Sequence, residues 1–566
     1  MTRRIVRWVA AAAALLFAVA PLSDRGVRPA VSVTPGPQPC FPRSSQMPST
    51  LYVADVGRLS SDEQLMYAAL QGIVNRSGPQ IYLEGEGSDT TSGLWLAKGA
   101  VPLPTETVAP AELLTRFASY VKGLVVWDPS LAVDTENVAT TIAGTDGLLP
   151  VSPTLAAQLL APPYNLAIRV DLRNEHFTGR DQAYAWAMTH FGFPDSRVLA
   201  WIGGTGNGLR DLIVACRGFA FQADPELDVA LVEQILRGYP PLTPVFGYPC
   251  LDDEILSATE HTDGTGIPVC EPAGVSEISE SGKYLIPADL STNLTVHAAF
   301  PPSVRAPPWD DRPQAPDPTK TYVTFVISDG DNVGYNEQYM LDHQWSDPGH
   351  GHIPMGVSIS PWLDVYAPNL YAYYVDTTTP EDVLLAGPSG GGYAYPGEEA
   401  DLSGYLGQTQ ALMDQAGLST PWILDNGYAS SPSPPVIDDY VRTLHPPGIF
   451  TDYFGWTIPN PPAVSFDQGV PVAHAVWGSC VADTVGRIRL TAATAPTRPN
   501  FVFVALNTWQ MSFSSAMTVM SELGPNYVVV RPDQFFELIR GAGQVVPTVA
   551  PPSTSPSPPA TNYCVP

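Results

Sequence analysis

Acidic side chains follow several short apolar segments in the C-terminal half of the chain. Asp329, Asp331, Asp425 and Asp452 each lie within a few residues of the end of such a segment. Hydrolysis of a glycosidic bond needs two carboxyl groups, one acting as an acid and the other as a base or a nucleophile. The four aspartates are therefore candidate catalytic residues. We expect Asp331 to be the acid and Asp452 the base or nucleophile.

Amide and aromatic side chains follow the same apolar segments, and lysine is absent from these stretches. The candidate substrate-binding residues are Asn332, Trp362, Asp364, Gly392, Tyr393, Tyr395, Asn426, Tyr428, Trp456, Trp477, Asn507 and Trp509. Sugar C–H faces pack on aromatic rings, while carboxylates and amides exchange hydrogen bonds with hydroxyl groups. This mixture predicts a site for a neutral polyhydroxylated ligand.

A repeating pattern of strands and helices would bring these residues together. Eight apolar segments read as short strands, at 322–328, 355–359, 383–386, 422–424, 448–451, 472–477, 501–506 and 527–530. Helical patterns occupy 402–416, 513–523 and 532–541. Alternating strands and helices indicate a parallel sheet, and residues 320–541 have nearly the length of a (β/α)₈ barrel of the TIM type, typically about 250 residues. A seven-stranded barrel fits the pattern nearly as well. In either barrel the active site lies at the carboxyl ends of the strands.

The N-terminal half, residues 49–300, also alternates strands and helices and reads as an α/β region of one or more subdomains. A capping box at 61–64 predicts a helix to residue 75. The strand at 198–202 is followed by the sequence GGTGNG and a helix. Leu209 stands where a dinucleotide-binding motif would have its last glycine, which favours a structural turn over a phosphate cradle. Residues 301–319 are rich in proline and predict a linker.

The ends of the chain and its cysteines suggest an exported protein. Arg3, Arg4 and Arg7 precede an apolar run to Ala20, so residues 1–20 predict a signal peptide and a secreted location. An uncleaved N-terminal anchor is the alternative. Residues 21–48 predict a flexible lead, and the Pro/Ser/Thr-rich residues 542–566 predict an extended tail. Disulfides are expected among the six cysteines, and their pairing is left open.

Charge and motifs narrow the ligands. The net charge of −28 disfavours nucleic acid, whose binding needs clustered Lys and Arg. No cofactor is predicted. His343, His350, His352 and Asp347 lie close in sequence, but a loop of this kind is more typical of exposed residues than of a metal site. The acidic run 252–254 is an alternative contributor from the N-terminal half.

Several motifs together resemble one family. The run GGGYAYP at 390–396 is similar to the motif that names the GxGYxYP family of glycoside hydrolases. SDGDN at 328–332 resembles a further signature of that family's C-terminal domain. ALQGIVNRSGPQIYL at 69–83 and RDLIVACRGFAF at 210–221 resemble its N-terminal domains. The resemblance covers nearly the whole mature chain and implies a secreted carbohydrate-active protein with a barrel-like C-terminal domain. It carries no catalytic assignment to particular residues.

The sequence therefore predicts a secreted glycoside hydrolase that acts on an oligo- or polysaccharide with a pair of aspartates at the barrel rim. One alternative is a non-catalytic glycan-binding protein. Another is a metal-dependent enzyme similar to polysaccharide deacetylases, which would use Asp329, Asp331 and a histidine. The oligomeric state is not predicted.

Overall fold

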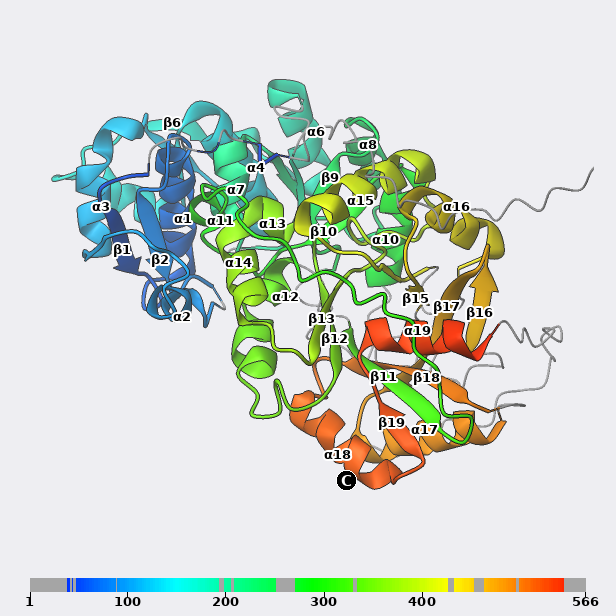
Figure 1. The fold of residues 1–566 in the computed structure, drawn as a ribbon. Helices are drawn as coiled ribbons and strands as arrows, with labels where there is room; N and C mark the ends of the chain where they lie inside the picture. The colour runs from blue at the N-terminus through cyan, green and yellow to red at the C-terminus, as the bar shows by residue number, and fades with distance from the viewer. Residues whose placement is uncertain are drawn as a thin grey trace, which may run out of the picture. The chain divides into compact units, whose positions relative to one another are not determined.

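The computed structural model describes residues 38–40, 43, 47–87, 89–192, 198–204, 208–250, 270–328, 333–425, 432–451, 463–494 and 498–543. All of them belong to one unit, Gly36–Pro566. Its N-terminal half contains three small parallel sheets, and its C-terminal half is a barrel (Figure 1). Within the described residues, no helix is long and apolar enough to cross a membrane.

The first two sheets have three strands each, and in both sheets the first strand in the chain is the central one. The first has the order β2 (Ile81–Glu84), β1 (Leu51–Asp55), β3 (Thr105–Thr107), and the second has the order β5 (Leu149–Val151), β4 (Leu124–Val126), β6 (Ile168–Asp171). The helices around them are α1 (Ser61–Asn75), α2 (Ser92–Ala97), α3 (Pro110–Arg116), α4 (Ala132–Asp146), α5 (Pro153–Leu159) and α6 (Arg180–Phe191).

Helix α1 begins one residue earlier than the capping box at 61–64 predicted. Its N-cap is Ser60, and the capping box joins Ser60 to Glu63, whose side chain accepts the Ser60 N–H at 3.0 Å. Since Ser60 and Ser61 are adjacent and both precede acidic residues, the pattern alone did not separate them.

The third sheet has the order β10 (Tyr284–Pro287), β9 (Pro244–Gly247), β7 (Leu199–Trp201), β8 (Phe219–Phe221). Its helices are α7 (Arg210–Cys216), α8 (Val229–Arg237), α10 (Cys270–Glu280) and α11 (Leu294–His297). The turn after β7 is held by Arg210, whose guanidinium donates to the carbonyls of Gly203 (2.7 Å) and Gly204 (3.0 Å). These contacts match the structural turn expected there, of which residues 205–207 lie outside the described residues.

The C-terminal half is a nearly closed barrel of seven parallel strands. Their order is β13 (Asp382–Ala386), β12 (Met355–Ile359), β11 (Thr321–Ser328), β18 (Asn500–Asn507), β17 (Val470–Gly478), β15 (Ile449–Thr451), β14 (Trp422–Ile423). A parallel bridge from Ala386 to Pro421 joins the two ends of this series. The seven-stranded form of the predicted barrel is thus confirmed.

All eight segments expected to be strands are strands, but the last one does not form an eighth strand of the barrel. β19 (Tyr527–Val529) pairs only with the first half of β11, from Thr321 to Val323, and β12 takes up the pairing with β11 at Val326. One further strand, β16 (Val464–Asp467), runs antiparallel to β17.

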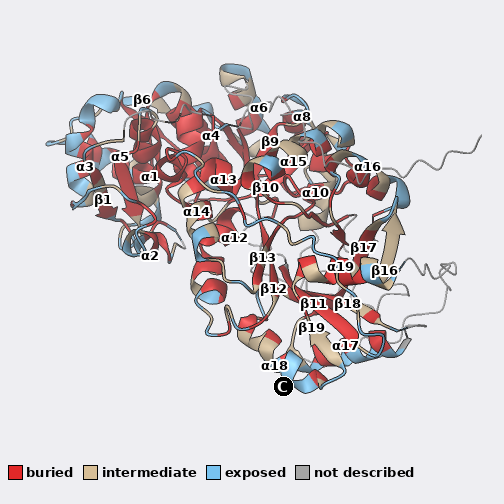
Figure 2. Ribbon diagram, in the orientation of Figure 1, coloured by how far each residue is buried: buried red, intermediate tan, exposed pale blue. Residues whose placement is uncertain are grey.

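Helices and a π-helical segment cover the barrel. They are α12 (Val333–Glu337), the π-helical segment Met340–Trp345, α13 (Leu363–Tyr366), α14 (Pro368–Thr377), α15 (Leu402–Ala416), α16 (Pro434–Leu444), α17 (Val481–Thr494), α18 (Phe513–Leu523) and α19 (Pro532–Ala542). Buried residues fill the barrel strands, while exposed residues lie on the outer faces of the helices (Figure 2). The strands are apolar on both faces because both are covered.

The third sheet and the barrel share one hydrophobic core. Phe246 of β9 packs edge-on against Tyr366 with ring centroids 5.1 Å apart, and Tyr284 of β10 stacks on Trp362 at 6.0 Å. The contact between the two parts is therefore a packed interface, which fixes the residues that each part brings to it.

Disulfides connect distant and local parts of the N-terminal half. Cys40 pairs with Cys216, and Cys250 pairs with Cys270 at the start of α10. Cys480 is also disulfide-bonded, whereas Cys564 lies outside the described residues. The expectation of disulfides is thus confirmed. The predicted linker 301–319 runs without helix or strand.

Candidate functional site

The glycine-rich loop that follows β13 joins the barrel to the third sheet. Tyr393 forms an antiparallel bridge with Leu285 on edge strand β10, and each residue donates its N–H to the other's carbonyl at 2.8 Å. The N–H of Tyr395 donates to Ser279 Oγ of α10 at 3.0 Å. The loop therefore extends the third sheet by a short strand-like contact.

The barrel holds the same loop from its other side. Trp362 Nε1 donates to the carbonyl of Gly391 (2.6 Å), and the Tyr405 hydroxyl donates to that of Gly392 (2.8 Å). The Tyr440 hydroxyl donates to the carbonyl of Ser389 at 2.7 Å. Three buried side chains thus satisfy the loop's backbone where it passes through the interior.

Carboxylates and tyrosines meet where this loop reaches the end of β14. Asp425 is 4 % exposed, and its Oδ1 accepts the Gly397 N–H at 2.8 Å. The Tyr393 hydroxyl donates to Glu271 Oε1 at 2.9 Å and lies 3.4 Å from the Tyr395 hydroxyl. We call these residues, together with Tyr248, the rim cluster.

The rim cluster is acidic. Burial raises the pKa of Tyr395, and the negative charges of Glu271, Glu398 and Asp425 raise it further. Glu271 and Asp425 are therefore both close enough to Tyr395 to interact with it electrostatically. The rim cluster thus combines carboxylates with tyrosine hydroxyl groups, and glycoside hydrolysis needs two carboxyl groups at its site.

The remaining predicted residues fall into three groups. Asp329, Asp331, Asn332, Asn426, Tyr428, Asp452 and Trp456 lie outside the described residues, as does the acidic run 252–254. Trp362 and Asp364 are buried, and Asp364 Oδ2 accepts from Gln415 Nε2 at 2.8 Å. Burial raises the pKa of Asp364 to about 6. A direct contact of these two residues with a ligand stays a prediction.

The third group lies at the carboxyl ends of β17 and β18. Trp477 is part of β17, and Asn507 ends β18 with its Oδ1 accepting the Trp509 N–H at 2.9 Å. Trp509 is 44 % exposed, and one side of its ring packs on Tyr339 at 4.6 Å between centroids. An exposed, supported indole at this end of the barrel is suited to pack against a sugar ring.

Tyr393 and Tyr395 are more deeply buried than the prediction of ligand contact suggested. They are 6 % and 2 % exposed. Their described contacts are with Glu271, Leu285 and Ser279. Both tyrosines thus hold the rim cluster, and a ligand contact stays a prediction.

Glu271 and Tyr248 were not singled out in the sequence. Tyr248 donates its hydroxyl hydrogen to Glu271, which stands next to the disulfide-bonded Cys270. More than 100 residues separate Glu271 from its partner Tyr393 (122), so no local pattern relates them. The position of Glu271 beside a cysteine was the one available signal.

The histidines considered for a metal site lie in the segment before β12, where the described contacts are hydrogen bonds to other protein groups. His350 Nε2 bonds to Asp382 Oδ2 at 3.0 Å, and Asp347 Oδ1 accepts from the Ser514 N–H at 2.9 Å. Within the part of the chain that the structure describes, no group of three or more His, Cys, Asp or Glu residues could hold a metal ion.

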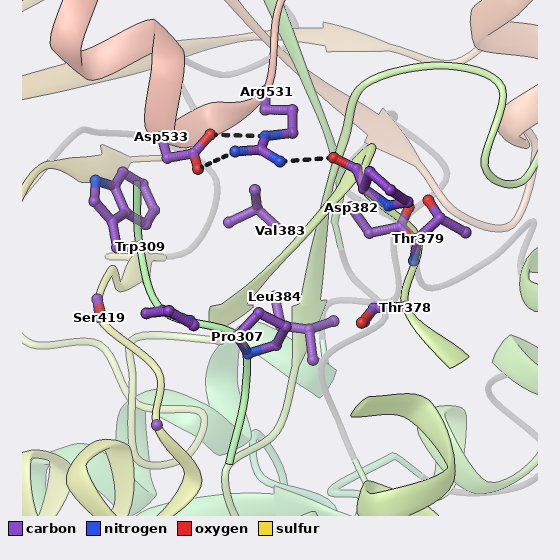
Figure 3. A pocket seen from close by; sticks show the side chains of 13 residues that line it. Pro307, Trp309, Thr378, Thr379, Asp382, Val383, Leu384, Ser419, Arg531 and Asp533 are labelled. Carbon is purple, nitrogen blue, oxygen red and sulfur yellow. Dashed lines mark hydrogen bonds and ion pairs between the residues drawn. The ribbon is translucent and has the colours of Figure 1, made fainter. Parts of the chain in front are cut away.

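A cavity of about 300 Å³ lies at the other end of β13 (Figure 3). Its lining includes Trp309 of the linker, Asp382 to Leu384 at the start of β13, and Arg531 just before α19. Arg531 is neutralised by Asp533 at 2.7 Å and bonds to the carbonyl of Pro380 at 2.6 Å. Because active sites of such barrels lie at the carboxyl ends of the strands, we do not count this cavity as the active site.

Comparison with known families gives four consecutive matches. Residues 50–119, 121–195 and 197–299 match the first, second and third N-terminal domains of the GxGYxYP family, and residues 319–540 match its C-terminal domain. The chain belongs to the GxGYxYP family. The C-terminal domain of the GxGYxYP family is described as a "putative glycoside hydrolase" domain. The first three matched segments coincide with the three small sheets, and the fourth coincides with the barrel.

A solved structure has the same fold. It is a crystal structure described as a "putative hydrolase" from Bacteroides thetaiotaomicron, with 23 % sequence identity and a TM-score of 0.75. The match covers 89 % of this chain and 97 % of that one. No curated protein matches this chain.

The interface between the third sheet and the barrel contains a buried acid whose ionisation we expect to weaken it. Burial raises the pKa of Glu399 to about 7 and lowers that of its neighbour Lys283 to about 8. The folded protein therefore holds a proton on Glu399 at pH values where the unfolded chain, near 4.5, has lost it. The contribution of Glu399 to the free energy of unfolding is therefore fully present below pH 4.5, and it is lost as the pH rises from 4.5 through 7.

Replacing Glu399 by Gln should remove this dependence while keeping an acceptor for the Asp401 N–H. Relative to wild type, Glu399→Gln should gain about 2–3 kcal/mol of unfolding free energy between pH 4.5 and pH 8. Denaturant unfolding of both proteins at pH 5.0 and 7.5 measures the difference. An equal difference at both pH values would show that Glu399 titrates normally.

Proposed function

We propose that this protein is a secreted glycoside hydrolase whose active site lies at the carboxyl end of the barrel. The catalytic carboxylates come from Asp329, Asp331, Asp425 and Asp452, which follow β11, β14 and β15. The aromatic and amide residues of the same rim bind the sugar. The substrate is an oligo- or polysaccharide.

One observation carries this proposal. Asp425, a carboxylate just after barrel strand β14, is buried, and its negative charge, like that of Glu271, raises the pKa of Tyr395. The Tyr393 hydroxyl, 3.4 Å from that of Tyr395, donates to Glu271. The exposed Trp509 stands at the end of another strand of the same barrel. Family membership and the fold of the related crystal structure agree with a hydrolase. The paired cysteines suit an oxidising compartment, which supports secretion.

The proposal is tested by release of reducing ends from a broad panel of oligo- and polysaccharides. Wild type should cleave at least one of them, and Asp331→Asn and Asp452→Asn should each lose turnover while still binding that glycan. If wild type binds glycans but cleaves none of the panel, the protein is a binding protein and the proposal fails.

Chelation separates a hydrolase of this kind from a metal-dependent deacetylase. We expect activity to be unchanged after dialysis against EDTA, because carboxylate-based hydrolysis needs only proton transfer and nucleophilic attack. Loss of activity on chelation, with recovery on adding Zn²⁺, together with acetate release from an acetylated glycan, would instead support the metal-dependent alternative.

A further inference from the structure

The strand order of the third sheet reverses its direction at β7. β7 is the first strand of this sheet in the chain, and it lies between β8 and β9. The chain therefore continues from β7 to β8 on one side of β7, and from β9 to β10 on the other side. In open parallel sheets, ligands bind in the crevice outside the carboxyl ends of such a strand pair. Tyr248 stands at this point, directly after β9, and donates its N–H to Trp201 at the end of β7 (2.9 Å).

The carboxyl end of the third sheet meets the carboxyl end of the barrel at Glu271. The Tyr248 hydroxyl, from the third sheet, donates to one oxygen of Glu271. The Tyr393 hydroxyl, from the loop after barrel strand β13, donates to the other oxygen at 2.9 Å. Glu271 is partly exposed. The hydroxyl groups of the two tyrosines fix the orientation of its carboxylate. Its backbone is fixed by the neighbouring disulfide between Cys250 and Cys270.

We propose that Glu271 contacts the substrate, so that the third N-terminal domain forms one side of the glycan-binding site. This inference rests on the glycoside hydrolase function proposed above and adds a residue from outside the barrel to it. A carboxylate held by two phenol groups accepts hydrogen bonds from vicinal sugar hydroxyls, and such charge-assisted bonds are about twice as strong as neutral ones.

The charges around Glu271 also restrict the class of glycan. The charges of Glu398 and Asp425, like that of Glu271, raise the pKa of Tyr395, and the whole chain carries a net charge of −28. A glycan with carboxylate or sulfate groups would be repelled by this cluster. The site therefore takes a neutral glycan or one with amino groups.

Binding of defined tetrasaccharides to an Asp425→Asn background tests the inference. The probes are cellotetraose, maltotetraose, mannotetraose, chitotetraose, its deacetylated amino form and tetragalacturonic acid, measured by calorimetry. Adding Glu271→Gln should weaken the binding of the best neutral or amino probe by about tenfold to hundredfold. Tetragalacturonic acid should bind weakest in the Asp425→Asn protein.

Glu280→Gln is the matched control, since it makes the same change on an exposed position of the same helix. It should leave binding unchanged, and thermal midpoints should show that both variants fold. In otherwise wild-type protein, Glu271→Gln should raise KM by a similar factor. If Glu271→Gln binds and cleaves as Glu280→Gln does, the inference is wrong even where wild type is active. If Glu271→Gln weakens binding but wild type cleaves no glycan, the site assignment stands and the hydrolase function fails.

Discussion

Replacing Asp425 by Asn should lower kcat by about 10²–10⁴-fold, the usual contribution of a carboxyl group that transfers a proton or charge in the transition state. The amide oxygen of Asn can still accept the Gly397 N–H that Asp425 Oδ1 now accepts at 2.8 Å. The loop should therefore keep its place, and the loss should fall on kcat with little change in KM. Steady-state kinetics on the best glycan of the panel measures both constants.

The control for this variant is Asp414→Asn, on the exposed face of α15. It makes the same chemical change away from the rim and should behave as wild type. If Asp425→Asn retains more than about a tenth of the wild-type kcat, Asp425 holds the loop and takes no part in the chemistry.

Replacing Gly392 by Ala should lower the free energy of unfolding by about 2–4 kcal/mol. Its φ of +140° lies in a region that L side chains rarely adopt, and an added Cβ would come within 2.4 Å of Tyr284 Cδ2. Tyr284 is fully buried between the third sheet and the barrel, so its ring has no room to move. Chemical denaturation should detect the loss, with the largest effect on the interface between these two parts.

Gly407→Ala gives the comparison for this effect. Gly407 is exposed on α15, and an added Cβ there meets nothing within 4 Å. The change should be neutral or stabilise by about 0.5–1 kcal/mol, since Ala is the better helix former. If both substitutions have the same small effect, the close approach at Gly392 does not hold the interface.

Local sequence patterns predicted the barrel because the residues at the ends of its helices and strands mark where each element begins and ends. The helix at 402–416 was predicted to the residue from the spacing of its apolar residues and from Gly417, which ends it in a left-handed conformation (φ +81°). The structure adds that Asp401 caps its start. The number of strands in the barrel could not be predicted in this way, because it depends on the register between strands. β19 is as apolar as its neighbours, yet it reaches only the first half of β11, and strand pairing across the sheet is not encoded locally.

The site was predicted in part, for a similar reason. Asp425 could be proposed because it follows a strand, and strand ends share one rim in a parallel barrel. The rule of strand ends also explains the exposed Trp509. It does not extend to Glu271, which belongs to helix α10 beside the third sheet and meets the rim through the Tyr393 hydroxyl. The glycine-rich motif led to the prediction of a ligand contact, which stays a prediction, and its described contacts fix the loop against Trp362 and Tyr405.

A crystal structure of the Asp425→Asn protein with a bound oligosaccharide tests the central claim most directly. We expect a sugar ring at the carboxyl end of the barrel, within hydrogen-bonding distance of residue 425 and of Glu271, with another ring near Trp509. A sugar bound only in the cavity beside Trp309 and Arg531, at the amino ends of the strands, would contradict the proposed site.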